Sequence, residues 1–130
     1  MKFRYIKPLL VASLMFMIFQ IVRAENGPLF PTGISLDQDG HMVISEKGRR
    51  RVAVYSNDGK SLVKTYEMAD VPTGVLCADD KIFVTTFQAK GMLHVLNGEN
   101  GSEIACIETG SGACCPVAGE RKDLVYVCNQ

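Results

Sequence analysis

A Pro-Thr-Gly triplet occurs twice in the chain, and each copy opens a stretch with the same pattern of apolar runs and turns. The first copy, from Pro31, reads PTGISLDQDGHMVIS, and the second, from Pro72, reads PTGVLCADDKIFVTT. These two prolines are 41 residues apart, and a partial third copy is predicted to begin at Cys115-Pro116, with Pro116 44 residues after Pro72. Internal periods of ~20–50 residues indicate a repeat architecture, in which each unit buries an apolar face against its neighbours.

Each full copy contains four short runs that favour β-strands. The predicted strands are Gly33–Leu36, Met42–Ser45, Val52–Tyr55 and Leu62–Tyr66 in the first copy, and Val75–Ala78, Ile82–Thr86, Met92–Leu96 and Glu103–Ile107 in the second. Asp58-Gly59 is a turn pair of the kind that joins antiparallel strands. No stretch after residue 24 keeps a 3.6-residue apolar period, so this part of the chain is predicted to be all-β.

Four-stranded units at this spacing are typical of the blades of a β-propeller. We predict a partial β-propeller over 25–130, with two complete four-stranded antiparallel blades at 30–70 and 71–112 and half of a third blade at 113–130. A propeller closes with ~4–8 blades. The sequence is therefore interpreted as an N-terminal fragment of a longer protein.

The first 24 residues have the layout of a secretory signal peptide, predicted as a helix ahead of the blades. Lys2, Arg4 and Lys7 form a basic start, Pro8–Val22 is an uncharged apolar run, and Val22-Arg23-Ala24 offers compact residues to signal peptidase. An uncleaved anchor is the alternative, but the run has 15 residues, fewer than the ~20 of a spanning helix. We expect a secreted or periplasmic protein that meets the membrane only through its signal sequence during export.

Removal of this leader makes the chain acidic. The sequence has 14 basic and 14 acidic side chains, and residues 1–24 contain four basic and no acidic ones, which leaves 10 basic against 14 acidic, a formal charge of −4. This balance argues against binding to nucleic acid or to an anionic membrane surface. The expected partner is an unidentified protein, glycan or small-molecule ligand.

The copies resemble two known repeat families. The Pro-x-Gly start, the Asp-x-Asp-Gly turn, the strand RVAVY and the Asp-Gly-Lys turn of the first copy resemble an NHL repeat. The strand endings FVTT at 83–86 and YVCN at 126–129 are similar to the YVTN repeats of extracytoplasmic propellers. The resemblance covers Phe30 to Gln130 and implies a propeller that presents a binding or scaffold surface outside the cytoplasm.

The same resemblance leaves enzymatic alternatives open. Propellers of this kind include lactonases, lyases and oxidoreductases, and some are fused to cytochromes for electron transfer. In either case the active residues would lie beyond Gln130, because no nucleophile motif, haem-attachment motif or zinc-ligand spacing occurs in the sequence. No catalytic residue, cofactor-binding residue or cofactor is therefore predicted.

A basic cluster is the candidate ligand-binding face. In propellers of this kind the loop between the second and third strands shares a face with the loops between blades. That face would carry Lys47, Arg49, Arg50 and Lys90, whose cations suit carboxylate or phosphate groups. The alternative is a solvated turn in which Arg51 has a structural role.

Neither histidine is predicted to bind a metal. His41 and His94 have no carboxylate or second histidine at ligand spacing in the sequence. Asp37, Asp39 and Gly40 resemble part of a calcium loop, but the remaining acidic ligands are missing and a hairpin turn explains them.

Five cysteines, Cys77, Cys106, Cys114, Cys115 and Cys128, would enter an oxidising compartment on export. Folding the last two strands about a turn at 120–123 places Cys115 opposite Cys128, which predicts a disulfide between them. A vicinal Cys114–Cys115 bond and free thiols are the alternatives. Cys77 and Cys106 belong to the first and fourth strands of one blade and are too far apart to bridge within it.

We expect the exported protein to begin at Glu25. The basic start, apolar run and compact cleavage residues of the leader are those that signal peptidase processes. The intact mass of the exported protein measures this directly. A mass that retains Met1–Ala24 would contradict the leader and indicate an anchored protein.

Overall fold

The computed structural model describes residues 27–121 and 123–130, so the predicted leader at 1–24 lies outside the described part. Apart from one 3₁₀ turn, η1 (Lys47–Arg49), the regular structure there is β. The strands are β1 (Pro31–Leu36), β2 (Met42–Glu46), β3 (Arg51–Tyr55), β4 (Leu62–Glu67), β5 (Val71–Ala78), β6 (Lys81–Phe87), β7 (Met92–Asn97), β8 (Glu103–Glu108), β9 (Cys114–Ala118) and β10 (Val125–Cys128). Within residues 27–121 and 123–130, no helix is long and apolar enough to span a bilayer.

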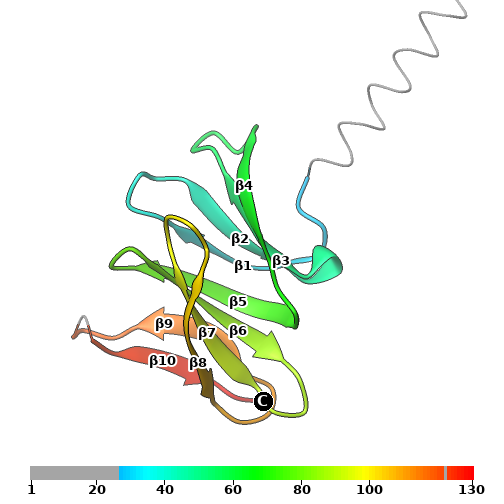
Figure 1. Ribbon diagram of the computed structural model, residues 1–130, viewed down its shortest axis with the longest axis vertical. Helices are drawn as coiled ribbons and strands as arrows, with labels where there is room; N and C mark the ends of the chain where they lie inside the picture. Colours follow the sequence, from blue (N-terminus) through cyan, green and yellow to red (C-terminus); the bar gives the residue numbers. More distant parts are fainter. Residues whose placement is uncertain (1–26, 122) are drawn as a thin grey trace, which may run out of the picture.

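The strands form three antiparallel sheets that stack side by side (Figure 1). Blade 1 has the order β1-β2-β3-β4, blade 2 the order β5-β6-β7-β8, and the third sheet consists of β9 and β10. Each four-stranded sheet is a simple meander in which neighbours along the chain pair with each other. The prediction of an all-β chain with four-stranded antiparallel sheets is confirmed.

The innermost strands begin earlier than predicted. β1 starts at Pro31 and β5 at Val71, because the Pro-Thr-Gly triplets pair with the next strand in spite of the low β-propensity of proline and glycine. A register shift occurs within each triplet, between Pro31 and Gly33 and again between Pro72 and Gly74. The threonine of each triplet is the extra residue of a β-bulge.

This bulged threonine joins one blade to the next. The Thr32 hydroxyl donates to the carbonyl oxygen of Pro72 at 3.1 Å, and the Thr73 hydroxyl donates to that of Ala113 at 2.6 Å. In both cases donor and acceptor are 40 residues apart. The sequence period is therefore present in the structure as a repeated hydrogen bond between blades.

The glycine of each triplet allows the inner strands to approach closely. A Cβ on Gly33 would lie 3.0 Å from the backbone nitrogen of Val75, and one on Gly74 would lie 2.7 Å from Cδ of Pro116. Only glycine avoids these contacts without a shift of the neighbouring strand. β1 accordingly lies beside β5, and β5 beside β9.

The third copy of the repeat begins at Ala113, so the predicted start at Cys115-Pro116 was wrong. Ala113 accepts the hydrogen bond from Thr73, as Pro72 accepts the one from Thr32. It is also 41 residues after Pro72, the same spacing that separates Pro31 from Pro72. Pro116 was aligned with Pro31 and Pro72 because it is a proline. The repeated hydrogen bond, however, needs only a backbone carbonyl at this position, which any residue supplies.

The core is the apolar layer between blades 1 and 2. Blade 1 contributes side chains from β2 and β3, and blade 2 contributes side chains from β5, β6 and β7. The buried members are Val43, Val52, Val54, Val75, Ile82, Val84 and Leu96. These residues alternate along their strands, so one face of each sheet is buried in this layer.

The described residues cover the opposite face of blade 1 only in part: Ile44, Ala53 and Tyr55 form a second buried cluster there, but the inner strand β1 is open. Ile34 and Val75 occupy the same position in their repeats, three residues after the first proline. Val75 packs against blade 1 and is 6% exposed, whereas Ile34 is 62% exposed. This partly open face is therefore the one that a preceding blade covers in a propeller, and its exposed apolar residues are Ile34 and Leu36 of β1.

We expect the chain to self-associate through this face, since an exposed apolar patch on a blade invites a neighbour. Burying one isoleucine contributes ~1.5–3 kcal/mol, so Ile34→Lys is expected to weaken association about tenfold or more. Sedimentation velocity over a range of concentrations measures the change. Ile107→Lys, at an exposed residue of the outer strand β8, is the control. A single sharp monomer boundary at every concentration would rule the association out.

Candidate functional site

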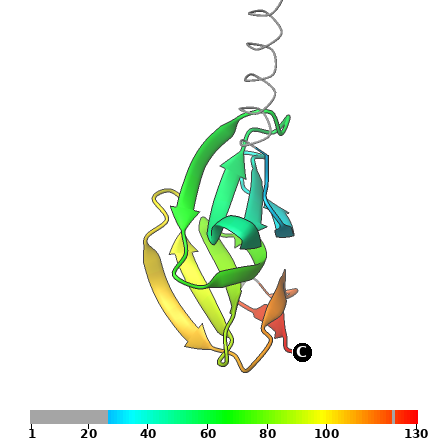
Figure 2. The same cartoon turned by 90° about the vertical axis from the view of Figure 1, so that its right-hand side faces the viewer.

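The two ends of the sheets form two distinct faces. The loop face carries the β2–β3, β4–β5, β6–β7 and β8–β9 connections (Figures 1 and 2). The turn face carries the β1–β2, β3–β4, β5–β6, β7–β8 and β9–β10 turns. On the loop face the Met68 amide donates to the Arg50 carbonyl at 2.8 Å, and the Thr109 amide donates to Gly91 at 2.9 Å. The expectation that the links between blades share a face with the β2–β3 loop is confirmed.

A buried carboxylate organises the basic residues of the β2–β3 loop. Glu46 is 0% exposed. It accepts hydrogen bonds from Arg51 Nε at 2.7 Å and from the Tyr55 hydroxyl at 3.0 Å, and Arg49 Nη1 lies 3.5 Å from it. The hydrogen bond to Glu46 raises the pKa of Arg51, and burial followed by the bond to Glu46 raises that of Tyr55. Arg51 therefore has a structural role.

The four residues of the predicted anion-binding face differ in their surroundings. Arg49 pairs with Glu46 and donates to the Gly27 carbonyl at 2.6 Å. Arg50 ends the 3₁₀ turn with a left-handed φ of 48°, and the exposed Lys90 lies 3.5 Å from Glu108. Lys47 is exposed on η1. A role for these four residues in anion binding stays a prediction.

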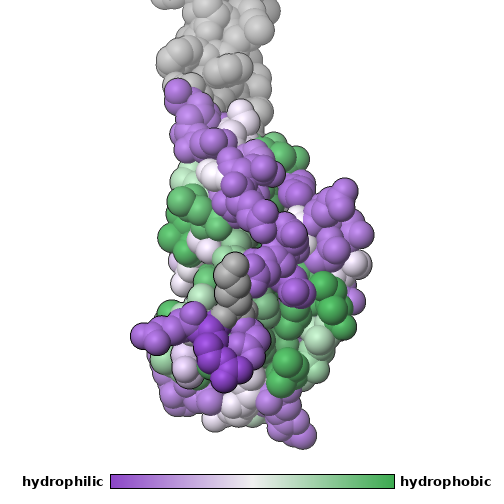
Figure 3. Space-filling model, turned by 90° about the vertical axis from the view of Figure 1, so that its left-hand side faces the viewer, coloured by the Kyte–Doolittle hydropathy of each residue, from purple (hydrophilic) through white to green (hydrophobic). Residues whose placement is uncertain are grey.

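The turn face contains a groove of about 770 Å³ between blades 1 and 2. Its floor includes apolar side chains of the core, and its walls are formed by the β1–β2, β5–β6 and β7–β8 turns. The acidic, basic and histidine side chains that line it are Asp37, Asp39, His41, Lys64, Asp80, Lys81 and Glu99. Hydrophilic side chains dominate this side of the molecule, with apolar patches beside them (Figure 3).

One wall of the groove is a hairpin turn held by an aspartate. Asp37 accepts hydrogen bonds from the backbone amides of Asp39 at 3.0 Å and His41 at 2.8 Å, and from His41 Nδ1 at 3.0 Å. Burial alone would raise the pKa of Asp37, but these hydrogen bonds lower it below its ordinary value. The hairpin interpretation of these residues is confirmed. The turn also folds Asp37 back onto the His41 ring, a contact that ligand spacing in the sequence did not indicate.

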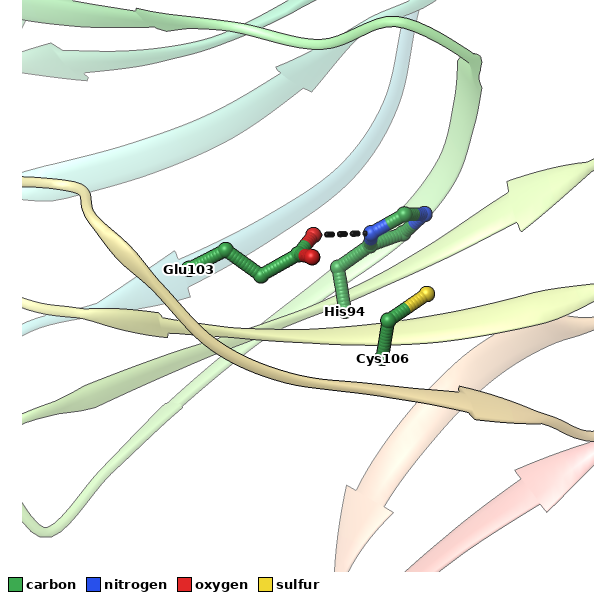
Figure 4. A group of neighbouring side chains, drawn as sticks. All are labelled: His94, Glu103 and Cys106. Carbon is green, nitrogen blue, oxygen red and sulfur yellow. Dashed lines mark hydrogen bonds and ion pairs between the residues drawn. The ribbon is translucent and has the colours of Figure 1, made fainter.

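The second histidine also has an acidic neighbour, which the sequence analysis missed. His94 on β7 is 8% exposed, and its Nδ1 lies 2.7 Å from Oε2 of Glu103 on β8 (Figure 4). Its Nε2 lies 3.2 Å from the Thr86 hydroxyl and 3.9 Å from Asp70 Oδ2. Glu103 is nine residues away along the chain, and only the pairing of β7 with β8 brings it to the ring.

Cys106 completes a group of three metal-ligand types around His94. A ring nitrogen of His94, a carboxylate oxygen of Glu103 and Sγ of Cys106 all lie within 4.8 Å of one another. Burial, together with the charges of Glu103 and Asp70, raises the pKa of the Cys106 thiol. Nitrogen, oxygen and sulfur donors in one group are the set that zinc accepts.

The β9–β10 pair corrects the predicted position of one cysteine. Val125 pairs with Ala118 and Tyr126 with Val117, as the predicted turn requires, but a register shift then places Cys128 opposite Cys114. The register on which a Cys115–Cys128 disulfide was predicted is therefore wrong at this step. The reason is a β-bulge, in which Cys115 adopts a left-handed φ of 50°.

The equivalent positions in the other blades show how close this pair lies. Cys114 follows Ala113 as Thr32 and Thr73 follow their prolines. The hydroxyl oxygens of Thr32 and Ser45 are 3.0 Å apart, and those of Thr73 and Thr85 are 3.1 Å apart. Side chains at this site of the repeat thus touch across the first two strands of a blade, and in the third sheet both are cysteines.

All five cysteines are free in the structure, but they differ in accessibility. Burial raises the pKa of the Cys77 thiol to about 11, which keeps it protonated and unreactive. Burial, followed by the neighbouring Cys115 and Cys128, raises the pKa of Cys114. Cys114 is half-buried and Cys115 and Cys128 are exposed, so the thiols of the third sheet are open to an oxidant.

On oxidation with glutathione disulfide we expect Cys128 to bond to Cys114, two thiols giving up their protons and two electrons to the oxidant. Trypsin cleaves after Arg121 and separates Cys128 from the other cysteines, so a disulfide keeps two peptides joined under non-reducing conditions. Cys114→Ser is expected to abolish the joined pair and Cys115→Ser to retain it. Loss of the joined pair in Cys115→Ser and its retention in Cys114→Ser would instead support the Cys115–Cys128 pairing.

Comparison with models of protein families gives no match, and comparison with curated protein sequences gives none. Solved structures do match. BamB from Moraxella catarrhalis aligns with a TM-score of 0.59 and 18% identity over 73% of this chain and 29% of its own. Hydrazine synthase from Kuenenia stuttgartiensis aligns with a TM-score of 0.56 and 16% identity over 64% of this chain and 25% of its own. Sqt1 from Saccharomyces cerevisiae aligns with a TM-score of 0.56 and 16% identity over 67% of this chain and 23% of its own.

These solved structures are β-propellers. The chain spans 29, 25 and 23% of their respective lengths, which corresponds to a few blades of a larger ring. At this level of identity the likeness concerns the fold alone. The described part of the chain has the fold of a β-propeller segment.

Proposed function

We propose that the chain is an exported segment of a YVTN- or NHL-like propeller and that it acts as a binding surface. The N-terminal leader supports export, and the repeat sequences support the family. The propeller neighbours support a binding or scaffold role. The observation that carries the proposal is the groove between blades 1 and 2 on the turn face.

The groove favours a ligand with a positive charge. Four carboxylates line it, those of Asp37, Asp39, Asp80 and Glu99, against the two ammonium groups of Lys64 and Lys81. One of these ammonium groups is already engaged, because Lys64 Nζ donates to the carbonyls of Gly98 and Glu99 at 3.1 and 3.2 Å. A cationic protein segment or a cationic small molecule therefore complements the groove.

The walls of the groove are held in place before any ligand arrives. Asp79 and Asp80 form the β5–β6 turn with left-handed φ angles of 47° and 57°. Such angles are costly for residues other than glycine, although aspartate tolerates them better than most. The Gly98 amide donates to the Asp80 carbonyl at 2.8 Å and ties this turn to the β7–β8 turn. Preorganised walls reduce the entropy lost on binding.

We expect a fluorescently labelled oligolysine peptide to bind more weakly when the groove loses charge. The double variant Asp80→Asn, Glu99→Gln removes two exposed carboxylates and keeps their shapes, and asparagine tolerates the left-handed angle at position 80. Exposed ion pairs contribute ~0.2–1 kcal/mol each, so loss of two should lower the affinity about twofold to thirtyfold. Fluorescence anisotropy at low and high salt measures the loss.

Glu108→Gln is the matched control, because Glu108 is an exposed carboxylate at the end of β8 near the loop face. It should leave the affinity unchanged. Equal weakening by the control would indicate diffuse attraction and contradict a groove site. Tighter binding of an oligoglutamate peptide would instead favour the basic residues Lys47, Arg49, Arg50 and Lys90.

A further inference from the structure

We propose that His94, Glu103 and Cys106 form a binding site for a zinc ion on the outer half of blade 2. The three side chains project from the neighbouring strands β7 and β8 toward one point (Figure 4). Their donor atoms lie within 4.8 Å of one another. Donors around a tetrahedral zinc ion are each ~2.0–2.3 Å from the metal, so a small opening of the group admits the ion.

A β-bulge brings the three donors to one face of the sheet. His94 lies opposite Cys106, and the register shifts between Val95 and Leu96 so that Leu96 lies opposite Glu103. Residues 103 and 106 are three apart, and in a regular strand they would point to opposite faces. The extra residue of the bulge reverses this alternation and turns Glu103 toward the face that carries Cys106.

Blade 1 has the same bulge without the ligands. Its register shifts between Val54 and Tyr55, the positions that correspond to Val95 and Leu96. Ala53 stands where blade 2 has His94, Thr65 where it has Cys106, and Leu62 where it has Glu103. The fold therefore requires the bulge but not these three side chains, and the donor set is a property of blade 2 alone.

Groups behind the imidazole hold it in the orientation of a ligand. Nε2 lies 3.2 Å from the Thr86 hydroxyl and 3.9 Å from Asp70, which directs Nδ1 to Glu103. Asp70 is itself held by a hydrogen bond from the side-chain amide of Gln88. A metal-binding histidine characteristically donates its second N–H to such a partner, which sets the tautomer.

The charge balance of the group also suits a cation. Glu103 and Asp70 place two carboxylates within 4 Å of a ring that is 8% exposed. Zinc would take the place of a proton at Nδ1, with the ring keeping its one proton on Nε2, and would bind Cys106 as a thiolate whose proton passes to solvent. Three protein donors leave a fourth position for water or a ligand group.

A second cluster of possible metal ligands, at the β1–β2 turn, is less suitable as a zinc site. Asp37, Asp39 and His41 are also within 4.8 Å of one another. One oxygen of Asp37 is occupied by two backbone amides of its own turn, and the other faces His41. These interactions account for the positions of Asp37 and His41, whereas among the described residues no turn or cap accounts for Glu103 and Cys106.

Cobalt(II) binding to the full 130-residue chain tests the site, because a thiolate bound to cobalt gives a near-ultraviolet charge-transfer band. The variant Cys114→Ser, Cys115→Ser, Cys128→Ser removes the thiols of the third sheet and is the background for the experiment. We expect the band in this background, its displacement by zinc, and its loss when Cys106→Ser is added. A band that survives Cys106→Ser, or no band in the background, would overturn the site.

Zinc affinity, measured by competition with a chromophoric chelator, gives a second readout. In the same background Glu103→Gln and Thr86→Val should each weaken zinc binding, with removal of the Thr86 partner costing ~10–100-fold. Far-ultraviolet circular dichroism confirms that the sheets persist. Folded variants that bind zinc as tightly as the background would refute the assigned donors.

Discussion

A threonine hydroxyl that reaches the backbone of the next blade underlies the whole arrangement. Thr32 bonds to the carbonyl of Pro72, and Thr73 bonds to that of Ala113. The adjoining glycines let the inner strands lie near enough for this bond to form. The separation of the blades follows from this contact, and with it the thickness of the apolar layer between them. The groove and the face of blade 2 that carries His94 both lie at this interface.

The blades share a framework and differ in chemistry at a few positions. The threonine and hydroxyl pair of the first two blades, Thr32–Ser45 and Thr73–Thr85, becomes Cys114–Cys128 in the third sheet. The alanine of blade 1 at position 53 becomes His94 in blade 2. Such exchanges leave the backbone pairing unchanged. Function in a repeat protein can therefore reside in the positions where one unit departs from the next.

The framework could be predicted from the sequence, because it depends on apolar alternation and turn residues. The eight predicted strands of the two full repeats all overlap observed strands, although β1 and β5 begin earlier than predicted, and the predicted turn after Leu36 is held by Asp37. The groupings of His94 with Glu103 and of Cys128 with Cys114 could not be predicted in this way. Both depend on β-bulges, and one extra residue changes which side chains share a face. The bulges themselves have no residue signature here: Ile104 and Val63 occupy those in β8 and β4, and both are ordinary strand residues.

The threonine contact also bears on how such a chain changes over evolutionary time. The threonine of one unit donates a hydrogen bond to the first residue of the next, so consecutive units are joined by equivalent bonds, each between residues 40 apart in the chain. Tandem duplication of a whole unit preserves every existing contact, since the new copy joins on both sides as the old one did. Insertion of a shorter segment within an inner strand would separate the hydroxyl from its acceptor. Growth by whole units, followed by divergence of side chains within them, is the route that this geometry favours.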